Sequence, residues 1–310
     1  MDLQDFCQSC QNLSEKEQSI LPQFCLDVEK IFGQGEPNYQ NEGKIISLFY
    51  GDSKKLGRSM FFYRKKLIKL FYEWLQRLDL IGKGTVEYVS SLTYGQIVAS
   101  DTLAHYYFKS LDSVLKFINL VSHDPGGYEE RFLPLKTVVI LLWYGVDIAQ
   151  IPFVKRADLN EGECSVVISN SNGGYCLKLE EPYFSIIQKY ANAFVIYGSV
   201  AGRRLTLSKS EYLMRTDCRF AQFGDHMTEK GVRRLIVDFD KVAERLGHSL
   251  SVIELRKNGV FCRAYQFDKE GIPVNQALEK GAQNTSVAIT AGMVDLYLAW
   301  KQKYCEVTLN

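Results

Sequence analysis

The chain has 310 residues, of which 46% are hydrophobic and 24% are charged, and its formal net charge is +1 at pH 7. These values predict about two domains with ordinary hydrophobic cores. No apolar run approaches the roughly 20 residues of a membrane span, and the polar, acidic N-terminus does not resemble a signal peptide, so we expect a cytoplasmic protein.

Basic charge is concentrated in two separate windows of the sequence. Residues 1–42 contain eight acidic side chains and two lysines, whereas residues 51–84 contain nine lysines and arginines and three acids. Residues 199–234 contain eight basic and four acidic side chains. A protein that encloses a DNA duplex from two sides needs one basic region in each domain. Solvated helix faces would produce the same distribution.

The first strong pattern along the chain predicts an N-terminal helix. Residues 13–32 have apolar side chains at helical spacing, and Ser14 and Glu17 have the spacing of a capping box. A glycine-containing segment that starts at Gly33 ends this helix. We therefore predict a helical extension over residues 1–42.

The next part of the chain predicts a small helical domain over residues 43–123. Residues 58–80 carry one apolar stripe, and most of their basic side chains lie off this stripe. Residues 91–100 and 103–121 add two further helical patterns. The candidate DNA contacts of this domain are Lys54, Lys55, Arg58, Arg64, Lys65, Lys66 and Lys69.

Residues 124–134 combine proline, glycine and charge, and this composition predicts an interdomain linker. The second domain then covers residues 135–310. Residues 164–169 and 175–179 have strand composition, and the Asn/Ser/Gly segment 170–174 between them predicts a β-hairpin. The expected fold class is mainly α with a small antiparallel β-sheet.

The eight cysteines and four histidines form no recognisable metal-binding pattern. Cys7 and Cys10 have zinc-ligand spacing and Cys25 follows, but no fourth ligand lies at a usual distance. We expect reduced, mostly buried thiols, no metal site and no cofactor.

Two stretches resemble the catalytic domain of the tyrosine recombinase (phage integrase) family. Residues 133–159 (LPLKTVVILLWYGVDIAQIPFVKRADL) contain an apolar helix, a glycine-containing turn, a short helix and an aspartate before a strand. Residues 231–262 contain a long helix, a loop and the pair Leu255-Arg256 at the start of the next helix. The resemblance implies a two-domain clamp around DNA, built from a helical core-binding domain and an α/β catalytic-type domain.

The resemblance also implies that the catalytic residues of the family are degenerate here. Asp147 stands where the family has the arginine that binds the scissile phosphate, and a carboxylate repels a phosphate at contact distance. Arg256 retains the family's second arginine, while Ile253 replaces a histidine that would form hydrogen bonds. Tyr297 lies five residues after Gly292, the position that matches the nucleophilic tyrosine. The matching positions are Asp147, Lys178, Ile253, Arg256, Gln283, Gly292 and Tyr297.

The cations that remain could still hold DNA, because an arginine pairs with phosphate oxygens without any catalytic partner. For Arg203 and Arg204, a solvated turn explains the residues equally well. The candidate DNA contacts of the second domain are Arg203, Arg204, Lys230, Arg233, Arg234, Arg256 and Lys257.

These patterns favour a catalytically inactive protein that binds a double-stranded DNA operator and acts as a phage or prophage transcriptional repressor. The second hypothesis is an active, diverged recombinase that uses Tyr297 or Tyr304. The third is an interaction scaffold that has lost DNA binding as well. A protein or peptide regulator and a homo-oligomer on DNA remain open as further partners.

Overall fold

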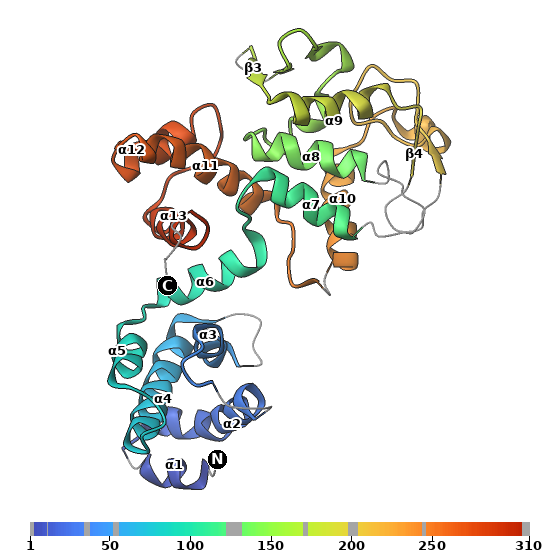
Figure 1. Cartoon of the computed structure of the whole chain (residues 1–310). Coiled ribbons are helices and arrows are strands. Elements are labelled where there is room, and N and C mark those ends of the chain that lie inside the picture. Colours follow the sequence, from blue (N-terminus) through green and yellow to red (C-terminus); the bar gives the residue numbers. More distant parts are fainter. Residues whose placement is uncertain are drawn as a thin grey trace. The chain divides into compact units, whose positions relative to one another are not determined.

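The computed structural model describes residues 3–10, 12–33, 38–51, 56–121, 132–169, 173–197, 204–243 and 246–305. The chain folds into two compact units, Met1–Thr102 and Leu103–Asn310, each with its own hydrophobic core (Figure 1). Helices dominate the described ranges, and the strands within them form a three-stranded and a two-stranded antiparallel sheet. This confirms the predicted mainly α class with little antiparallel β-structure.

The first unit consists of two long helices, α2 and α4, and several shorter ones that share one core. Its helices are α1 (Leu3–Ser9), α2 (Glu15–Phe32), α3 (Glu42–Tyr50), α4 (Arg58–Arg77) and α5 (Lys83–Ser91), and α6 (Tyr94–Tyr106) begins in this unit. The apolar stripe of α4, with Phe61, Leu67, Phe71 and Leu75, is buried as its spacing predicted. The Phe71 ring lies 5.5 Å from the ring of Phe6, so α1 shares the same core.

The start of α2 confirms the predicted capping box. The Ser14 Oγ accepts a hydrogen bond from the backbone N–H of Glu17 at 3.4 Å, and Glu17 Oε2 accepts one from the Ser14 N–H at 2.8 Å. These two bonds satisfy backbone donors that have no partner inside the helix.

The division between the units differs from the boundaries that we predicted. The expected extension, residues 1–42, is part of the first core, because Phe24 and Phe32 of α2 pack against Phe71. Helix α7 (Leu111–Val121), which we assigned to the first domain, belongs to the core of the second unit, because its buried face packs against the next helix. Of the predicted linker, residues 124–131 lie outside the described residues, and residues 132–134 are buried.

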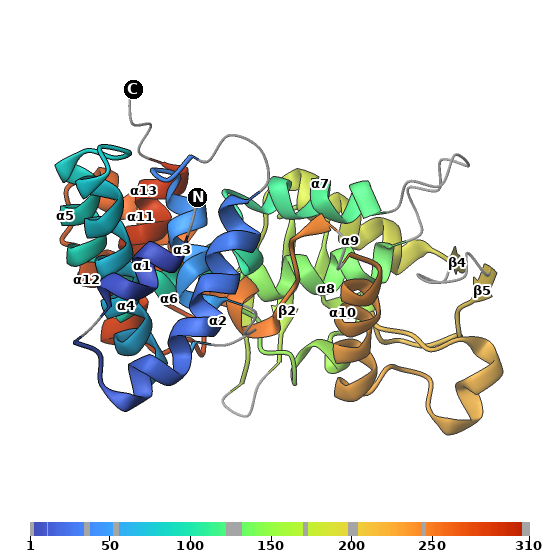
Figure 2. The same cartoon turned by 90° about the horizontal axis from the view of Figure 1, so that it is seen from below.

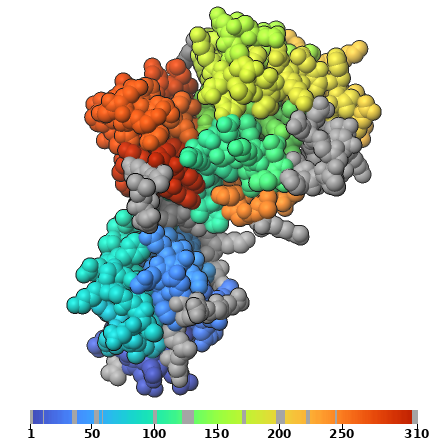
Figure 3. Space-filling view, in the orientation of Figure 1, coloured from blue at the N-terminus to red at the C-terminus, as the bar shows by residue number. Residues whose placement is uncertain are grey.

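The second unit contains a helical core and two small sheets. Its further elements are α8 (Leu133–Trp143), η1 (Ile151–Phe153), η2 (Arg156–Asp158), β1 (Leu159–Asn160), β2 (Ser165–Ile168), β3 (Tyr175–Lys178), α9 (Glu181–Asn192), β4 (Val195–Tyr197), β5 (Arg204–Thr206), η3 (Cys218–Phe223), α10 (Glu229–Ala243), α11 (Val252–Lys269), α12 (Val274–Gly281) and α13 (Ala291–Tyr304). Helices α8 and α9 lie between α11–α13 on one side and α10 with β4 on the other (Figures 1 and 2). In the space-filling view, the orange and red atoms of α11–α13 gather at one side of this unit (Figure 3).

Helix α8 is the centre of the second core. All 11 of its residues are buried, which explains why its sequence is apolar on every side rather than on one stripe. The predicted hairpin is confirmed as β2 and β3, which pair antiparallel with Val166 opposite Leu177. The tip of its turn, residues 170–172, lies outside the described residues.

Helix α11 packs against α8 at a position that requires glycine. A side chain on Gly259 would overlap the carbonyl oxygen of Trp143 at the end of α8. Next to it, the buried Asn258 side chain accepts a hydrogen bond from the Phe108 N–H and donates one to the Phe108 carbonyl, both at 2.9 Å. Because these contacts leave little freedom, α11 holds its side chains at fixed positions relative to the end of α8.

The cysteines differ in part from our prediction. All eight are free thiols, but only Cys10 is buried, and Cys7, Cys176 and Cys218 are exposed. Within the described ranges, no group of three His, Cys, Asp or Glu side chains is arranged to hold a metal ion. In the same residues, no helix is both long and apolar enough to span a membrane.

Candidate nucleic-acid interface

The turn that follows α8 positions Asp147. Helix α8 ends at Trp143, and Gly145 adopts a φ of +97°, in the left-handed region that favours glycine. A side chain at Gly145 would overlap Thr285, so this turn lies directly against the segment that follows α12. The backbone N–H of Asp147 donates to Gln150 Oε1 at 3.1 Å, which orients the aspartate.

The Asp147 carboxylate accepts hydrogen bonds from three groups. Its Oδ1 accepts from the Ala149 N–H at 3.0 Å, and its Oδ2 lies 3.0 Å from Ser286 Oγ and 3.2 Å from Arg256 Nη1. Burial by itself raises the pKa of Asp147, but the bonds from Ala149 and Ser286 and the charge of Arg256 outweigh it and hold that pKa below its ordinary value. The carboxylate is therefore ionised at neutral pH. We refer to Asp147, Ser286 and Arg256 as the Asp147 cluster.

Arg256 directs its two Nη groups to partners within the chain, and its Nε is buried without a partner among the described residues. It lies near the start of α11, and its side chain is 12% exposed. Besides the bond to Asp147, its Nη2 donates to Ser286 Oγ and lies 3.5 Å from the Gly145 carbonyl oxygen. An arginine binds phosphate through a pair of adjacent N–H groups, and here such groups face a carboxylate and a hydroxyl of the same protein. This corrects our prediction that Arg256 is a free phosphate contact.

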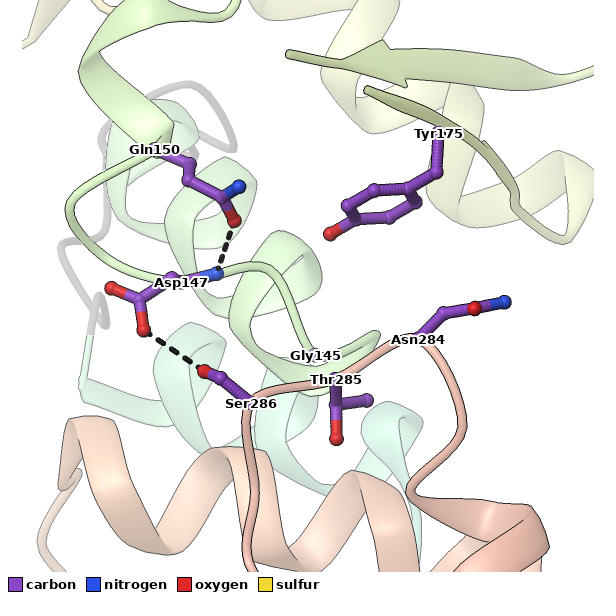
Figure 4. A pocket seen from close by; sticks show the side chains of 7 residues that line it. All are labelled: Gly145, Asp147, Gln150, Tyr175, Asn284, Thr285 and Ser286. Atoms are coloured by element: carbon purple, nitrogen blue, oxygen red, sulfur yellow. Dashed lines mark hydrogen bonds between the residues drawn. The ribbon is translucent and has the colours of Figure 1, made fainter. Parts of the chain in front are cut away.

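A cavity of about 400 Å³ opens beside the Asp147 cluster (Figure 4). Tyr175 projects into it from β3, with its hydroxyl toward the space between Gln150 and Gly145, and burial raises the pKa of this tyrosine (Figure 4). The described residues that line the cavity offer amides, hydroxyls and the Asp147 carboxylate, but no lysine or arginine. A phosphate beside this carboxylate would be repelled by about 1 kcal/mol in a water-like dielectric and by up to about 4 kcal/mol at an effective constant of ~20, and the lower part of this range applies because the Asp147 side chain is 37% exposed.

The hydroxyl groups of the two candidate tyrosines form hydrogen bonds to groups outside the Asp147 cluster. Tyr297 is fully buried in α13, and its hydroxyl donates to Asp268 Oδ2 at 2.8 Å. Burial and this carboxylate raise the pKa of Tyr297 far above its ordinary value. Asp268 lies 12 residues after Arg256 on α11, an axial distance of about 18 Å. The Tyr304 hydroxyl donates to the carbonyl of Tyr107 at 2.8 Å, and burial raises the pKa of Tyr304 to about 12.

The other degenerate positions are exposed. Ile253 is 63% exposed on α11, and Lys178 is exposed at the end of β3. Gln283 lies exposed in the turn after α12, and Gly292 is exposed at the start of α13. None of these four lines the cavity beside Asp147.

The candidate contacts of the first unit divide into buried and exposed groups. Arg64 is 5% exposed, and its Nη1 donates to Asp27 Oδ2 at 2.7 Å and to the Leu48 carbonyl at 2.8 Å. The structure therefore contradicts a DNA contact at Arg64. Lys65 is partly buried and donates to the carbonyl of Leu92 at 2.6 Å, and burial lowers its pKa.

Two lysines of the same helix remain accessible. The side chains of Lys66 and Lys69 are 46% and 49% exposed, and they pair with Glu17 at 2.7 Å and Glu73 at 3.6 Å. Lys54 and Lys55 lie outside the described residues, as does the side chain of Arg58.

In the second unit, the exposed candidates lie mainly on α10. Lys230 is exposed, and Arg233 and Arg234 are exposed while pairing with acids one turn away on the same helix, at 2.7 Å and 3.3 Å. Such surface pairs contribute well under ~1 kcal/mol, so a phosphate can replace the acid. Arg204 is exposed in β5, and Arg203 lies outside the described residues.

Lys257 is less free than we predicted. It pairs with Glu254 at 3.1 Å, its side chain is 29% exposed, and Glu254 also accepts a hydrogen bond from Tyr107. Releasing Lys257 for phosphate would leave a partly buried carboxylate without its cation.

Several residues that complete the site were not found by sequence patterns. Ser286 and Thr285 follow α12 in a segment without periodicity, yet Ser286 joins Arg256 to Asp147 by hydrogen bonds. Asp27 is buried in α2 and pairs with Arg64, and no sequence pattern had singled it out.

The comparisons with known proteins found neither a matching protein family nor a matching curated protein. Among solved structures, the chain is similar to XerA recombinase, with 15% identity over 97% of this chain and 96% of that one and a TM-score of 0.43. It is also similar to a lambda integrase dimer bound to a COC′ core site, with 13% identity over 96% and 95% of the two chains and a TM-score of 0.37. A third is the Tn1549 transposon integrase in complex with transposon right end DNA, with 14% identity over 92% and 93% and a TM-score of 0.36.

Proposed function

We propose that this protein is a sequence-specific double-stranded DNA-binding protein without phosphodiester-cleaving activity, and that it acts as a transcriptional repressor in a bacterial host cell. The Asp147 cluster carries this proposal. The position that matches a phosphate-binding arginine is an ionised carboxylate, and Arg256 donates to this carboxylate at 3.2 Å. A scissile phosphate would have to displace the carboxylate from Arg256 and then remain beside it.

The positions of the tyrosines support the absence of cleavage. A nucleophile must lie in line with the phosphate it attacks, and a displacement of even ~1 Å can lower the rate about 10²-fold. The Tyr297 hydroxyl is held by Asp268, about 18 Å along α11 from Arg256. The Tyr304 hydroxyl is held by the backbone of Tyr107.

The exposed cations support DNA binding. Lys230, Arg233 and Arg234 lie accessible on α10, and Lys66 and Lys69 lie accessible on α4. The ion pairs of Lys69, Arg233 and Arg234 are surface pairs that DNA phosphates can replace. Lys66 is less free, because its partner Glu17 is buried and would be left without its cation. The role as a repressor rests on the resemblance of the sequence to a recombinase with a degenerate catalytic set, and on its further resemblance to the master repressor of SPβ-like prophages.

DNA selection with the purified full chain tests the binding. Duplexes retained from a random library would be sequenced, and their affinity measured between 50 and 200 mM NaCl. We expect affinity to fall roughly 10²–10³-fold over this range, as for about four to six phosphate contacts. The substitution Arg234→Gln should make the slope of log K against log [NaCl] shallower by about 0.9.

A matched control and a cleavage assay complete this test. Lys116, an exposed lysine of α7 outside our candidate set, supplies the control substitution Lys116→Gln, which should leave the slope unchanged. Affinity that is indifferent to salt would contradict binding through phosphate contacts, and the retention of no duplex at all would support the scaffold hypothesis instead. A covalent adduct with a nicked duplex of the selected sequence, lost in Tyr297→Phe or Tyr304→Phe, would overturn the proposed inactivity.

A further inference from the structure

A second cavity, of about 350 Å³, lies in the second unit away from the Asp147 cluster. It is bordered by Arg156 of η2, by Leu159 of β1 and by one side of α9 that includes Phe184 and Gln188. The two cavities share no lining residue. We refer to this space as the Arg156 cavity.

Arg156 has a guanidinium without a described partner. Its backbone N–H donates to the Glu211 carbonyl at 2.7 Å, which fixes the residue. Its Nε is buried, and no described group accepts a hydrogen bond from it. Glu161 also borders the cavity, but no ion pair within 4.0 Å joins it to Arg156 in the described part of the chain. The buried Nε itself does not reach the cavity, but no hydrogen bond or ion pair of the Arg156 Nη groups is formed within the described residues, so these groups are the donors that the cavity wall offers to a ligand.

A second arginine next to this wall adds positive charge. Arg215 is 2% exposed, and its Nη2 donates to the carbonyls of Tyr190 at 2.9 Å, Ala191 at 3.2 Å and Ala193 at 2.7 Å. No carboxylate among the described residues pairs with it, and its Nε is buried without an acceptor. Burial lowers the pKa of Arg215, and the charge of Arg156 lowers it further.

Two guanidinium groups therefore share one region without a paired carboxylate. Burying a cation without a counter-ion is unfavourable, and an anion bound to Arg156 at the cavity wall would offset the repulsion between the two arginines, although Arg215 itself does not border the cavity. The hydroxyl of Tyr190, whose ring faces Arg215, is also buried without a partner. Of these three residues, Arg156 borders the cavity, whereas Arg215 is linked to it by its hydrogen bond to the carbonyl of Ala191, which borders the cavity.

The remaining lining indicates the size and class of the ligand. Gln188 and Asn192 are four residues apart on α9 and offer amides to a polar group, while Leu159 and Phe184 offer apolar surface. The volume is at the lower end of the range of small-molecule sites. Glu161 is exposed at the border and would repel a continuous chain of phosphates, which disfavours the DNA backbone as the ligand.

We propose that the Arg156 cavity binds a small organic anion, a molecule with one carboxylate or phosphate group that pairs with Arg156 and an apolar body that lies on Leu159 and Phe184. This site is independent of the DNA-binding role proposed above. A bound anion would be held by an element, η2, that leads directly into the three-stranded sheet.

Thermal unfolding of the full chain tests the site with three probes: acetate, benzoate and inorganic phosphate, each at 10 mM with ionic strength balanced by NaCl. A ligand with a dissociation constant near ~1 mM should raise the Tm by about 3–5 °C. We expect benzoate to exceed acetate because of its apolar body. Substitution Arg156→Gln should abolish the shift, and Gln188→Leu on the surface of α9 should reduce it without unfolding the protein. Lys116→Gln, at an exposed lysine of α7 outside both sites, should leave the shift unchanged.

Three results would overturn the proposal. One is the absence of any shift beyond that of NaCl for all three probes. Another is an equal shift in the Arg156→Gln protein. The third is evidence for a DNA contact. If the small anions cause no shift, and Arg156→Gln weakens binding to selected duplexes and makes its salt dependence shallower, Arg156 contacts the DNA backbone. A larger shift with phosphate than with benzoate would instead assign a phosphate ester as the ligand class.

Discussion

Replacing Asp147 with asparagine should strengthen DNA binding while weakening the fold. At about 5 Å, a carboxylate and a phosphate repel each other by roughly 1 kcal/mol in a water-like dielectric and by roughly 3 kcal/mol at an effective constant of ~20. The Asp147 side chain is 37% exposed, so the lower part of this range applies. Removing 1–2 kcal/mol of repulsion corresponds to an affinity gain of about 5- to 30-fold.

The same substitution removes the counter-ion of Arg256, whose side chain is 12% exposed. We expect a loss of about 1–2 kcal/mol in the free energy of unfolding, because a partly buried guanidinium then keeps only hydroxyl and carbonyl partners. Because the pKa of Asp147 is lower in the folded state, the ionised carboxylate stabilises the fold. This stabilisation is fully present above the pKa of the unfolded carboxyl, ~3.9, and is lost as the pH falls through the pKa of the folded state. The Asp147→Asn protein should therefore lose less stability than wild type on acidification.

Fluorescence anisotropy with selected duplexes at 50–200 mM NaCl, and urea unfolding, measure the two effects. Glu270→Gln removes the same charge at the exposed C-cap of α11 and should change the affinity less than about twofold. If Asp147→Asn leaves both affinity and salt dependence as in wild type, Asp147 does not face the DNA backbone, and the reasoning from the Asp147 cluster fails.

Three further substitutions or treatments test the fold. Arg64→Met should lower the free energy of unfolding by about 3–5 kcal/mol, because it leaves a buried carboxylate unpaired, and urea unfolding measures this. Gly259→Ala should destabilise the protein by about 3 kcal/mol through overlap with α8, whereas Gly292→Ala, where the space is open, should be neutral or slightly stabilising. Diamide should join Cys7 to Cys25, whose Sγ atoms lie 3.5 Å apart, as peptide mass spectrometry would show; a crosslink to another cysteine would contradict this geometry.

Local sequence patterns predicted the features that depend on near neighbours. The capping box at Ser14, the buried stripe of α4 and the β2–β3 hairpin all follow from residues within a few positions of one another. The unit boundary could not be found in this way. Helix α7 has an ordinary apolar face, and only the packing partner of that face decides to which unit the helix belongs.

The candidate site depended on contacts that are distant in sequence. Asp147 and Arg256 are 109 residues apart, and Asp147 and Ser286 are 139 residues apart. The sequence shows the charge of Asp147 and the charge of Arg256. It does not show that the two side chains form an ion pair. The same holds for Arg64, whose partner Asp27 is 37 residues away. A count of basic residues in a window therefore overestimated the cations available to DNA.

The glycine contact between α8 and α11 has a consequence for amide hydrogen exchange. Every residue of α8 is buried, and at Gly259 the α11 backbone touches the carbonyl of Trp143, so neither helix can open without the other. Their amides should exchange together and among the slowest of the chain. Asp147 follows the end of one helix and Arg256 lies near the start of the other, so their pairing should persist for as long as this unit stays folded.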